Sequence, residues 1–333
     1  GDWWVKKANS HKYAAKLLDD SRTSPAVLRQ VLLFLPPNHS ALTVSRLQDL
    51  LQSDDEQLRL ESVRRLRGID SEEAKSIVSS LARDEPSEAV LRAEAVIGLD
   101  SSKPNDRGLL LALAFDENAA VSQEAIRTLR GTLLDGNERT KIAGLKPTNQ
   151  PTAELLQQLL NPGEKQNRPA ATDLEKWLAL MDGPADRNAG QRVFFHPKGP
   201  GCSRCHRIDG RGTAIGPSFV RMNGGLSLKR ERLIEAILQP SKDIDPGYLP
   251  ITLVTTDGRT ASGIYHKHSG KVRQIYDSEG KVQTFKVEDI EQMVPAKTSI
   301  MPNGLTDAMT IQEFRDIVAY LSGPSSPQNT STK

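Results

Sequence analysis

A nine-residue pattern that occurs three times constrains the first half of this 333-residue chain most strongly. The pattern is aliphatic-x-x-Glu-small-aliphatic-x-x-aliphatic, and it covers residues 58–66, 91–99 and 121–129, at offsets of 33 and 30 residues. Apolar residues three and four apart, which share one face of a helix, also recur between the copies, around 74–82 and 107–115. The period therefore predicts one pair of short antiparallel helices per repeat.

One such pair cannot bury its apolar face alone, so neighbouring pairs must stack. Residues 1–161 contain helix-start signals, such as Ser24-Pro25 and Ser71-Glu72-Glu73, and almost no strand signal. This part of the chain resembles HEAT-like repeats, although its periods are shorter than usual and residues 1–50 match poorly. The resemblance implies an N-terminal α-solenoid over residues 1–161. A helical domain without superhelical order stays open as an alternative.

Residues 162–183 are predicted to be a linker with a short helix. The stretch 161–173 is rich in Pro, Asn and Gly, which is typical of a linker. Thr172 or Asp173 then caps a helix that carries Trp177 and other apolar residues on one side, and Gly183-Pro184 ends it.

Cys202, Cys205 and His206 form the sequence C-x-x-C-H, which has the spacing of a c-type haem attachment site. In such a site both thiols add to the porphyrin vinyl groups and the imidazole ligates the iron. One helical turn brings the three side chains to the same face. A zinc site would need further ligands, for which His266 and His268 are weak candidates. A thioredoxin-like redox pair would follow a strand, whereas a loop is expected before Cys202.

Further motifs follow in the order found in class I cytochromes c. They are Gly190-Gln191-Arg192-Val193-Phe194-Phe195, Ile215-Gly216-Pro217, Gly247-Tyr248, Asp257-Gly258-Arg259, Ser299-Ile300-Met301-Pro302 and Tyr320-Leu321. Residues 184–323 thereby resemble the haem-binding domain that planctomycete-type proteins join to HEAT-like repeats. The resemblance implies a class I cytochrome c fold behind the solenoid in a mainly α chain, with Gly190 crossing the last helix at Tyr320. Residues 324–333 are expected to form a disordered tail.

The resemblance also implies one haem c and its ligands. Cys202 and Cys205 would attach the haem, and His206 and Met301 would ligate its iron from opposite sides. The Pro217 carbonyl would accept the Nδ1 proton of His206, which orients the ring. The other residues of the implied pocket are Arg211, Gly216, Tyr248 and Pro302. Arg211 would neutralise a propionate, although a solvated loop arginine fits equally well. Another methionine, His266, His268 or an open site stays the alternative to Met301.

Four β-rich runs lie between the two implied axial ligands. They are residues 248–256, 259–268, 271–277 and 281–287, separated by hairpin signals of the type Asp-Gly, Ser-Gly and Glu-Gly. They predict a four-stranded antiparallel meander inserted at 248–290. The insertion accounts for the 95 residues (301 minus 206) between His206 and Met301.

Composition limits the partners and the compartment. The chain has 44 basic and 42 acidic residues, a balance that argues against nucleic-acid binding and predicts charges on solvated helix faces. No apolar run is long enough to span a membrane, and no signal peptide opens the chain at Gly1. Because covalent haem attachment normally takes place outside the cytoplasm, we expect a periplasmic or other extracytoplasmic protein whose start is processed or recombinant.

Histidine and methionine ligation would leave the iron no position for substrate, so the sequence predicts one-electron transfer. The helical repeat would then dock or space a redox partner protein, such as a dehydrogenase or another cytochrome. Three alternatives stay open at this stage. The chain could be the electron-accepting part of a larger dehydrogenase, or a peroxidase-like haem enzyme if Met301 leaves the iron. The repeat could also be the functional part, with the haem as a sensor or structural plug.

Overall fold

The computed structural model describes residues 2–85, 87–164, 167–208, 210–219, 229–268 and 270–322. The chain divides into two compact units, Gly1–Glu164 and Lys165–Lys333, close to the domain end expected at residue 161. The described residues combine fourteen α-helices with two small antiparallel sheets, so the chain is mixed where a mainly α chain was expected. The strands all belong to the second unit. The expected tail, 324–333, lies outside the described residues.

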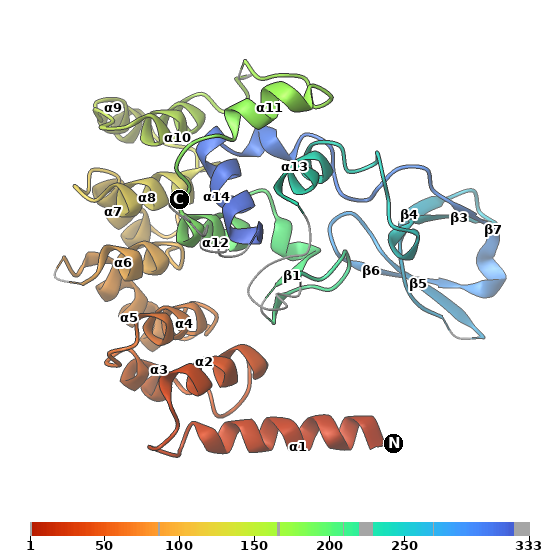
Figure 1. The fold of residues 1–333 in the computed structure, drawn as a ribbon, viewed down its shortest axis with the longest axis horizontal. Helices are drawn as coiled ribbons and strands as arrows, with labels where there is room; N and C mark the ends of the chain where they lie inside the picture. Colours follow the sequence, from red (N-terminus) through yellow and green to blue (C-terminus); the bar gives the residue numbers. More distant parts are fainter. Residues whose placement is uncertain are drawn as a thin grey trace, which may run out of the picture. The chain divides into compact units, whose positions relative to one another are not determined.

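The first unit is a stack of helices (Figure 1). Helices α2, α4, α6, α8 and α10 pack each against the next, and each also packs against the odd-numbered helix before it. The helices are α1 (Asp2–Leu17), α2 (Pro25–Phe34), α3 (Val44–Leu50), α4 (Glu56–Leu66), α5 (Glu72–Arg83), α6 (Ala89–Val96), α7 (Pro104–Leu113), α8 (Ala119–Leu129), α9 (Gly136–Ala143) and α10 (Gln150–Leu160). The three copies of the sequence pattern form α4, α6 and α8, with α5 and α7 between them.

Local sequence signals explain where these helices begin. The Ser71 hydroxyl accepts a hydrogen bond from the backbone N–H of Ala74 (3.1 Å) and caps α5 at the predicted place. Pro25 occupies the first turn of α2, where its missing N–H leaves no hydrogen bond unmade. Asp135 and Glu138 form a reciprocal capping box at α9, a signal that the sequence analysis passed over.

The glutamates of the repeated pattern are buried, which corrects the expectation of solvated helix charges. Glu61, Glu94 and Glu124 expose only 2%, 2% and 0% of their surface. Arg64 lies 3.6 Å from Glu61 and 3.1 Å from Glu94, so it links two successive repeats. Arg127 pairs with Glu124 at 2.5 Å. Because an unpaired buried charge is very costly, each of these glutamates needs an arginine nearby, and Glu94 receives Arg64 and Arg67 from the preceding repeat.

Helices cover the core of the second unit. They are α11 (Leu174–Leu180), α12 (Arg187–Phe195), α13 (Arg230–Leu238) and α14 (Ile311–Ser322), with short 3-10 turns η1 (Cys202–Arg204), η2 (Pro246–Tyr248), η3 (Val287–Asp289) and η4 (Leu305–Ala308). Helices α12 and α14 cross at Gly190, where an added Cβ would lie 1.9 Å from the carbonyl oxygen of Asp316. The predicted crossing is therefore present, but it meets the α14 backbone at Asp316, whereas Tyr320 packs on Phe194 with ring centroids 5.8 Å apart.

Part of the expected linker makes specific contacts with the second unit. The Arg168 guanidinium donates to the carbonyl oxygens of Thr306 and Met309. The indole N–H of Trp177 donates to the carbonyl oxygen of Ala170 (3.1 Å). The stretch 167–173 is thus fixed to the second unit, because its polar side chains have tertiary partners that composition does not reveal.

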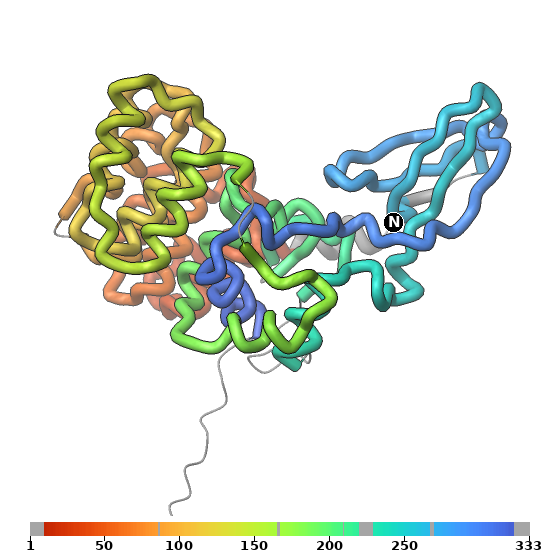
Figure 2. Tube along the Cα trace, turned by 90° about the horizontal axis from the view of Figure 1, so that it is seen from above, coloured from red at the N-terminus to blue at the C-terminus, as the bar shows by residue number. Residues whose placement is uncertain are grey.

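The insertion is a five-stranded antiparallel sheet of order β6-β5-β4-β3-β7, and Figure 2 follows the chain from α13 into the sheet and back to α14. Its strands are β3 (Ile251–Thr255), β4 (Thr260–His268), β5 (Val272–Tyr276), β6 (Val282–Lys286) and β7 (Ile290–Pro295). The predicted meander corresponds to β3 to β6. Strand β7 was missed and runs beyond the expected limit at residue 290. A small hairpin of β1 (Arg207–Ile208) and β2 (Arg211–Gly212) was also missed.

Candidate functional site

The attachment segment folds into a single turn. Gly201, with φ of 81°, begins the 3-10 turn η1. The carbonyl oxygen of Cys202 accepts hydrogen bonds from the backbone N–H groups of Cys205 (3.2 Å) and His206 (2.9 Å). The three side chains singled out in the sequence are therefore grouped by the local hydrogen bonding of one turn, and all three line the same cavity.

Cys202 and Cys205 form no disulfide with each other, and the surroundings of both favour the neutral thiol. Burial raises the pKa of Cys202 to about 12, and burial is also the main cause of the raised pKa of Cys205. A thioredoxin-like redox pair needs the opposite shift, because the thiolate is its nucleophile. The environment of these thiols therefore disfavours that alternative.

His206 is fixed in one orientation. Its Nδ1 lies 2.9 Å from the carbonyl oxygen of Pro217, so Nδ1–H donates and the other ring nitrogen, Nε2, keeps its lone pair. Burial lowers the pKa of His206, and the Pro217 bond opposes this only in part, so the ring is neutral at pH 7. The Phe219 ring stacks on the imidazole, with centroids 5.0 Å apart and planes at 24°. Gly216 leaves space for the imidazole ring, because a Cβ added at Gly216 would lie 2.8 Å from Cε1 of His206.

Met301 reaches the cavity from a distant part of the chain. Its backbone N–H donates to the Ser299 hydroxyl (3.1 Å), and the N–H of Ser299 donates to the hydroxyl of Ser241 after α13 (3.0 Å). Pro302 follows directly and restricts the backbone. The loop that carries Met301 is thus anchored to the segment that follows α13 before it enters η4 and α14.

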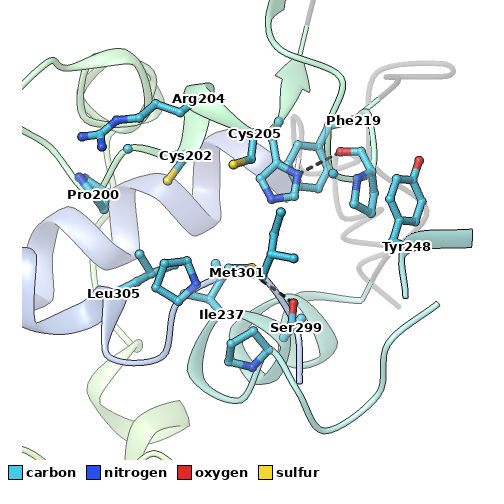
Figure 3. A pocket seen from close by; sticks show the side chains of 18 of the residues that line it. Pro200, Cys202, Arg204, Cys205, Phe219, Ile237, Tyr248, Ser299, Met301 and Leu305 are labelled. Carbon is cyan, nitrogen blue, oxygen red and sulfur yellow. Dashed lines mark hydrogen bonds between the residues drawn. The ribbon is translucent and has the colours of Figure 1, made fainter. Parts of the chain in front are cut away.

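The cavity has a volume of about 280 Å³ and gathers eight of the nine residues expected at the site. They are Cys202, Cys205, His206, Gly216, Pro217, Tyr248, Met301 and Pro302. Figure 3 shows Cys202 and Cys205 on one side of the cavity and Met301, Leu305 and Ile237 on the other. The ninth residue, Arg211, lies elsewhere: its guanidinium sits 4.8 Å from the centroid of the Phe195 ring.

The alternative ligands are placed differently from Met301. His266 packs against Tyr276 on the sheet, with ring centroids 4.3 Å apart, and the side chain of His268 lies outside the described residues. Among the other methionines, Met309 is buried and lines the cavity, Met181 is buried in the helical core and Met293 is 51% exposed on β7. Met222 lies outside the described residues. Met309 is therefore the one described alternative that borders the same cavity.

Several lining residues escaped the sequence analysis. Apolar ones are Phe194, Leu233, Ile237, Leu305, Ile317 and Leu321. Phe219 had a local signal, since it is an aromatic residue two positions after Pro217. Ser278 had none, because only the packing of the sheet brings it to the cavity. Sequence spacing thus finds the donor atoms and misses most of the walls.

Comparison with protein-family models and with curated proteins found no match to this chain. Among the described residues, no group of three or more His, Cys, Asp and Glu side chains is arranged to hold a metal ion. No helix in the described part of the chain has both the length and the apolar character needed to cross a membrane.

Proposed function

We propose that this protein is a c-type cytochrome that transfers single electrons through one covalently bound haem. The observation that supports the proposal most is the cavity itself. It brings Met301 to the same space as Cys202, Cys205 and His206, although 95 residues separate His206 from Met301. Chance occurrence of C-x-x-C-H would not supply a thioether on the far side of an apolar pocket.

The residues present fit a haem in their chemistry. The two thiols stand one turn apart, as two thioether bonds require. The imidazole is held by Pro217 through Nδ1, which leaves Nε2 to ligate iron and makes it more basic. The close approach of Gly216 to this ring also matches a fixed ligand, because any side chain there would displace it.

The haem supplies the redox chemistry, and its potential is set by the axial ligands and the burial of the site. His206 supplies a neutral nitrogen in a fixed orientation, and Met301 supplies a soft sulfur that favours the reduced metal. The apolar walls, such as Phe194 and Leu233, exclude water. If His206 and Met301 both held the haem iron, no position on the iron would be left for a substrate, and this supports electron transfer over substrate chemistry.

The wider interpretation of the chain belongs to the same proposal. Residues 184–323 would form a class I cytochrome c domain, and the helical stack would be HEAT-like repeats that dock or space a redox partner protein. The crossing of α12 and α14 at Gly190 supports this interpretation. Because haem c is normally attached outside the cytoplasm, the protein would work in the periplasm or another extracytoplasmic space.

Expression in a host that matures c-type cytochromes tests the proposal. We expect a red protein whose haem stays with the chain in acidified organic solvent. The variant Cys202→Ala with Cys205→Ala should lose this covalent haem, because no thiol remains to form a thioether. A colourless wild-type protein, or haem that extracts equally from both proteins, would contradict the proposal.

A further inference from the structure

The five-stranded sheet supplies no expected ligand, yet it reaches the cavity. Ile264 on β4 and Ser278 in the turn between β5 and β6 both line it. The turn, residues 277–281, packs against the segment that carries Cys205. The insertion is therefore a wall of the candidate site and not only a spacer between His206 and Met301.

Gly280 makes the closest contact of this turn. Its φ is 79°, and an added Cβ would lie 3.1 Å from the carbonyl oxygen of Arg204 and 3.2 Å from Cδ1 of Ile215. Both distances are shorter than ordinary van der Waals separations of about 3.5–4.0 Å. Glycine thus serves twice here, because it accepts the left-handed backbone and lets the turn lie directly on the residue before Cys205.

Asp277 holds the turn in shape. Its carboxylate accepts hydrogen bonds from the backbone N–H groups of Glu279 and Lys281 (2.9 Å each) and from Nε2 of Gln283 (3.0 Å). The Gln283 bond is the main cause of the lowered pKa of Asp277, which is therefore charged at neutral pH. The Asp277 N–H also donates to the carbonyl oxygen of Lys281 (3.0 Å). These bonds are independent of anything the cavity holds.

The surroundings of Cys205, which include this turn, shift the pKa of its thiol. Burial is the main cause of its raised pKa, Arg204 lowers the pKa, and the Asp277 carboxylate raises it again. The contact that puts the turn beside Cys205 is made by Gly280, which lies against the carbonyl oxygen of Arg204, the residue before Cys205.

We propose that residues 277–281 are a fixed cap over Cys205 that closes the cysteine side of the cavity to water and to a redox partner. The meaning of the cap rests on the proposed function, since the haem edge that bears the thioethers would lie beside these sulfurs. Water stabilises the more highly charged oxidised iron, so the cap raises the reduction potential. An electron partner then approaches another part of the cavity rim.

A pair of glycine variants separates the cap from general strain. Gly280→Val would push the turn away from Arg204. Gly258→Val is the matched control, because Gly258 has φ of 83° in the turn between β3 and β4 of the same sheet and has nothing within 4 Å of its added Cβ. Both variants place a β-branched side chain at positive φ, but only the first collides with the attachment segment.

Alkylation of the haem-free chain by iodoacetamide reads out the cap directly. Trypsin cleaves after Arg204, which puts Cys202 and Cys205 on different peptides for mass spectrometry. Cys205 should react several-fold faster in Gly280→Val, because displacement of the turn from Arg204 opens the neighbouring thiol to the reagent. Gly258→Val should match the wild type.

If iodoacetamide alkylates Cys205 at the same rate in the wild type, Gly280→Val and Gly258→Val, the proposed cap is wrong. If Gly280→Val does not fold, Gly280→Ala against Gly258→Ala makes the same comparison with a smaller side chain. The thiol measurement needs no haem, so the cap and the proposed function can fail separately. In haem-loaded protein we expect a lower midpoint potential for Gly280→Val than for Gly258→Val, and equal potentials would contradict the solvent-excluding role.

Discussion

The helical stack and the candidate site use polar side chains in different ways. In the helical stack, Glu61 and Glu94 are buried and paired with arginines, and Arg64 lies between the two. In the second unit, Cys205, His206 and Met301 are neutral donors that border a cavity, with no opposite charge to meet. Buried charges that are paired with each other have a structural role. Uncharged side chains that converge on an apolar cavity and could ligate a bound group are typical of a ligand site. A repeated polar residue can therefore be structural, and an unrepeated set of donors can carry the function.

Breaking the buried ion pairs should have the largest effect on stability. Glu94→Gln removes the charge shared by Arg64 (3.1 Å) and Arg67 (3.1 Å). Loss of one partner of a buried pair costs about 3–5 kcal/mol, and we expect about 3 kcal/mol because Arg64 keeps Glu61. Amide hydrogen exchange, followed by mass spectrometry, should become faster in α4, α6 and α8.

An exposed ion pair supplies the control for that change. Glu88 pairs with Arg59 at 2.7 Å, but its side chain is 54% exposed. Glu88→Gln should cost at most about 1 kcal/mol, because water already screens the pair. If the two variants destabilise the stack equally, burial does not distinguish the repeated glutamates, and the contrast drawn above fails.

The helix crossing in the second unit should be the next most sensitive place. Gly190→Ala puts a Cβ 1.9 Å from the carbonyl oxygen of Asp316, so α12 and α14 must separate, at a cost of about 1–3 kcal/mol or more. Gly108→Ala is the matched helix variant in the first unit. Its Cβ has nothing within 4 Å, and the change should stabilise by up to about 1 kcal/mol. Opposite signs in urea unfolding are expected, and a harmless Gly190→Ala would argue against the close crossing.

The smallest effect concerns a partly exposed pair in the stack. The Arg107 guanidinium, with Nε 2.6 Å from Glu138, is the main cause of the lowered pKa of Glu138. A carboxyl whose pKa is lowered by folding stabilises the protein above its unfolded pKa, near 4.5, and loses this as the pH falls through the folded pKa. The stability difference between wild type and Glu138→Gln should therefore shrink from pH 7 to pH 3. A stability difference that stays constant with pH would indicate that the hydrogen bonds between Asp135 and Glu138 at the start of α9, and not the ion pair with Arg107, account for the effect.

Sequence reasoning was strongest where a local pattern carries the structure. The repeat at Glu61, Glu94 and Glu124 located three helices of one layer, and C-x-x-C-H located a single turn. Whether these residues are buried or exposed could not be predicted from the local pattern. The same charged residues were expected in solvent, because only the stacking of neighbouring repeats buries them and brings Arg64 between two glutamates.

The parts that were missed depend on contacts between distant segments. Strand β7 has five exposed residues out of six and pairs with β3, about forty residues earlier, so it shows no alternation of its own. Ser278 joins the cavity only through the position of the sheet. Arg211 was expected to neutralise a haem propionate or to be a solvated loop arginine; the β1 and β2 hairpin places its guanidinium over the Phe195 ring. Nearness in sequence does not fix the direction of a side chain.

The account depends most on the claim that His206 and Met301 clamp one haem. The direct measurement is the red absorption spectrum of the oxidised, haem-loaded protein, in which a weak band reports sulfur bound to iron. We predict that the band is present in the wild type, persists in Met309→Leu and disappears in Met301→Ala, which should also lower the potential and open the iron to cyanide. A wild-type spectrum without the band, or a band that survives Met301→Ala, would contradict the account.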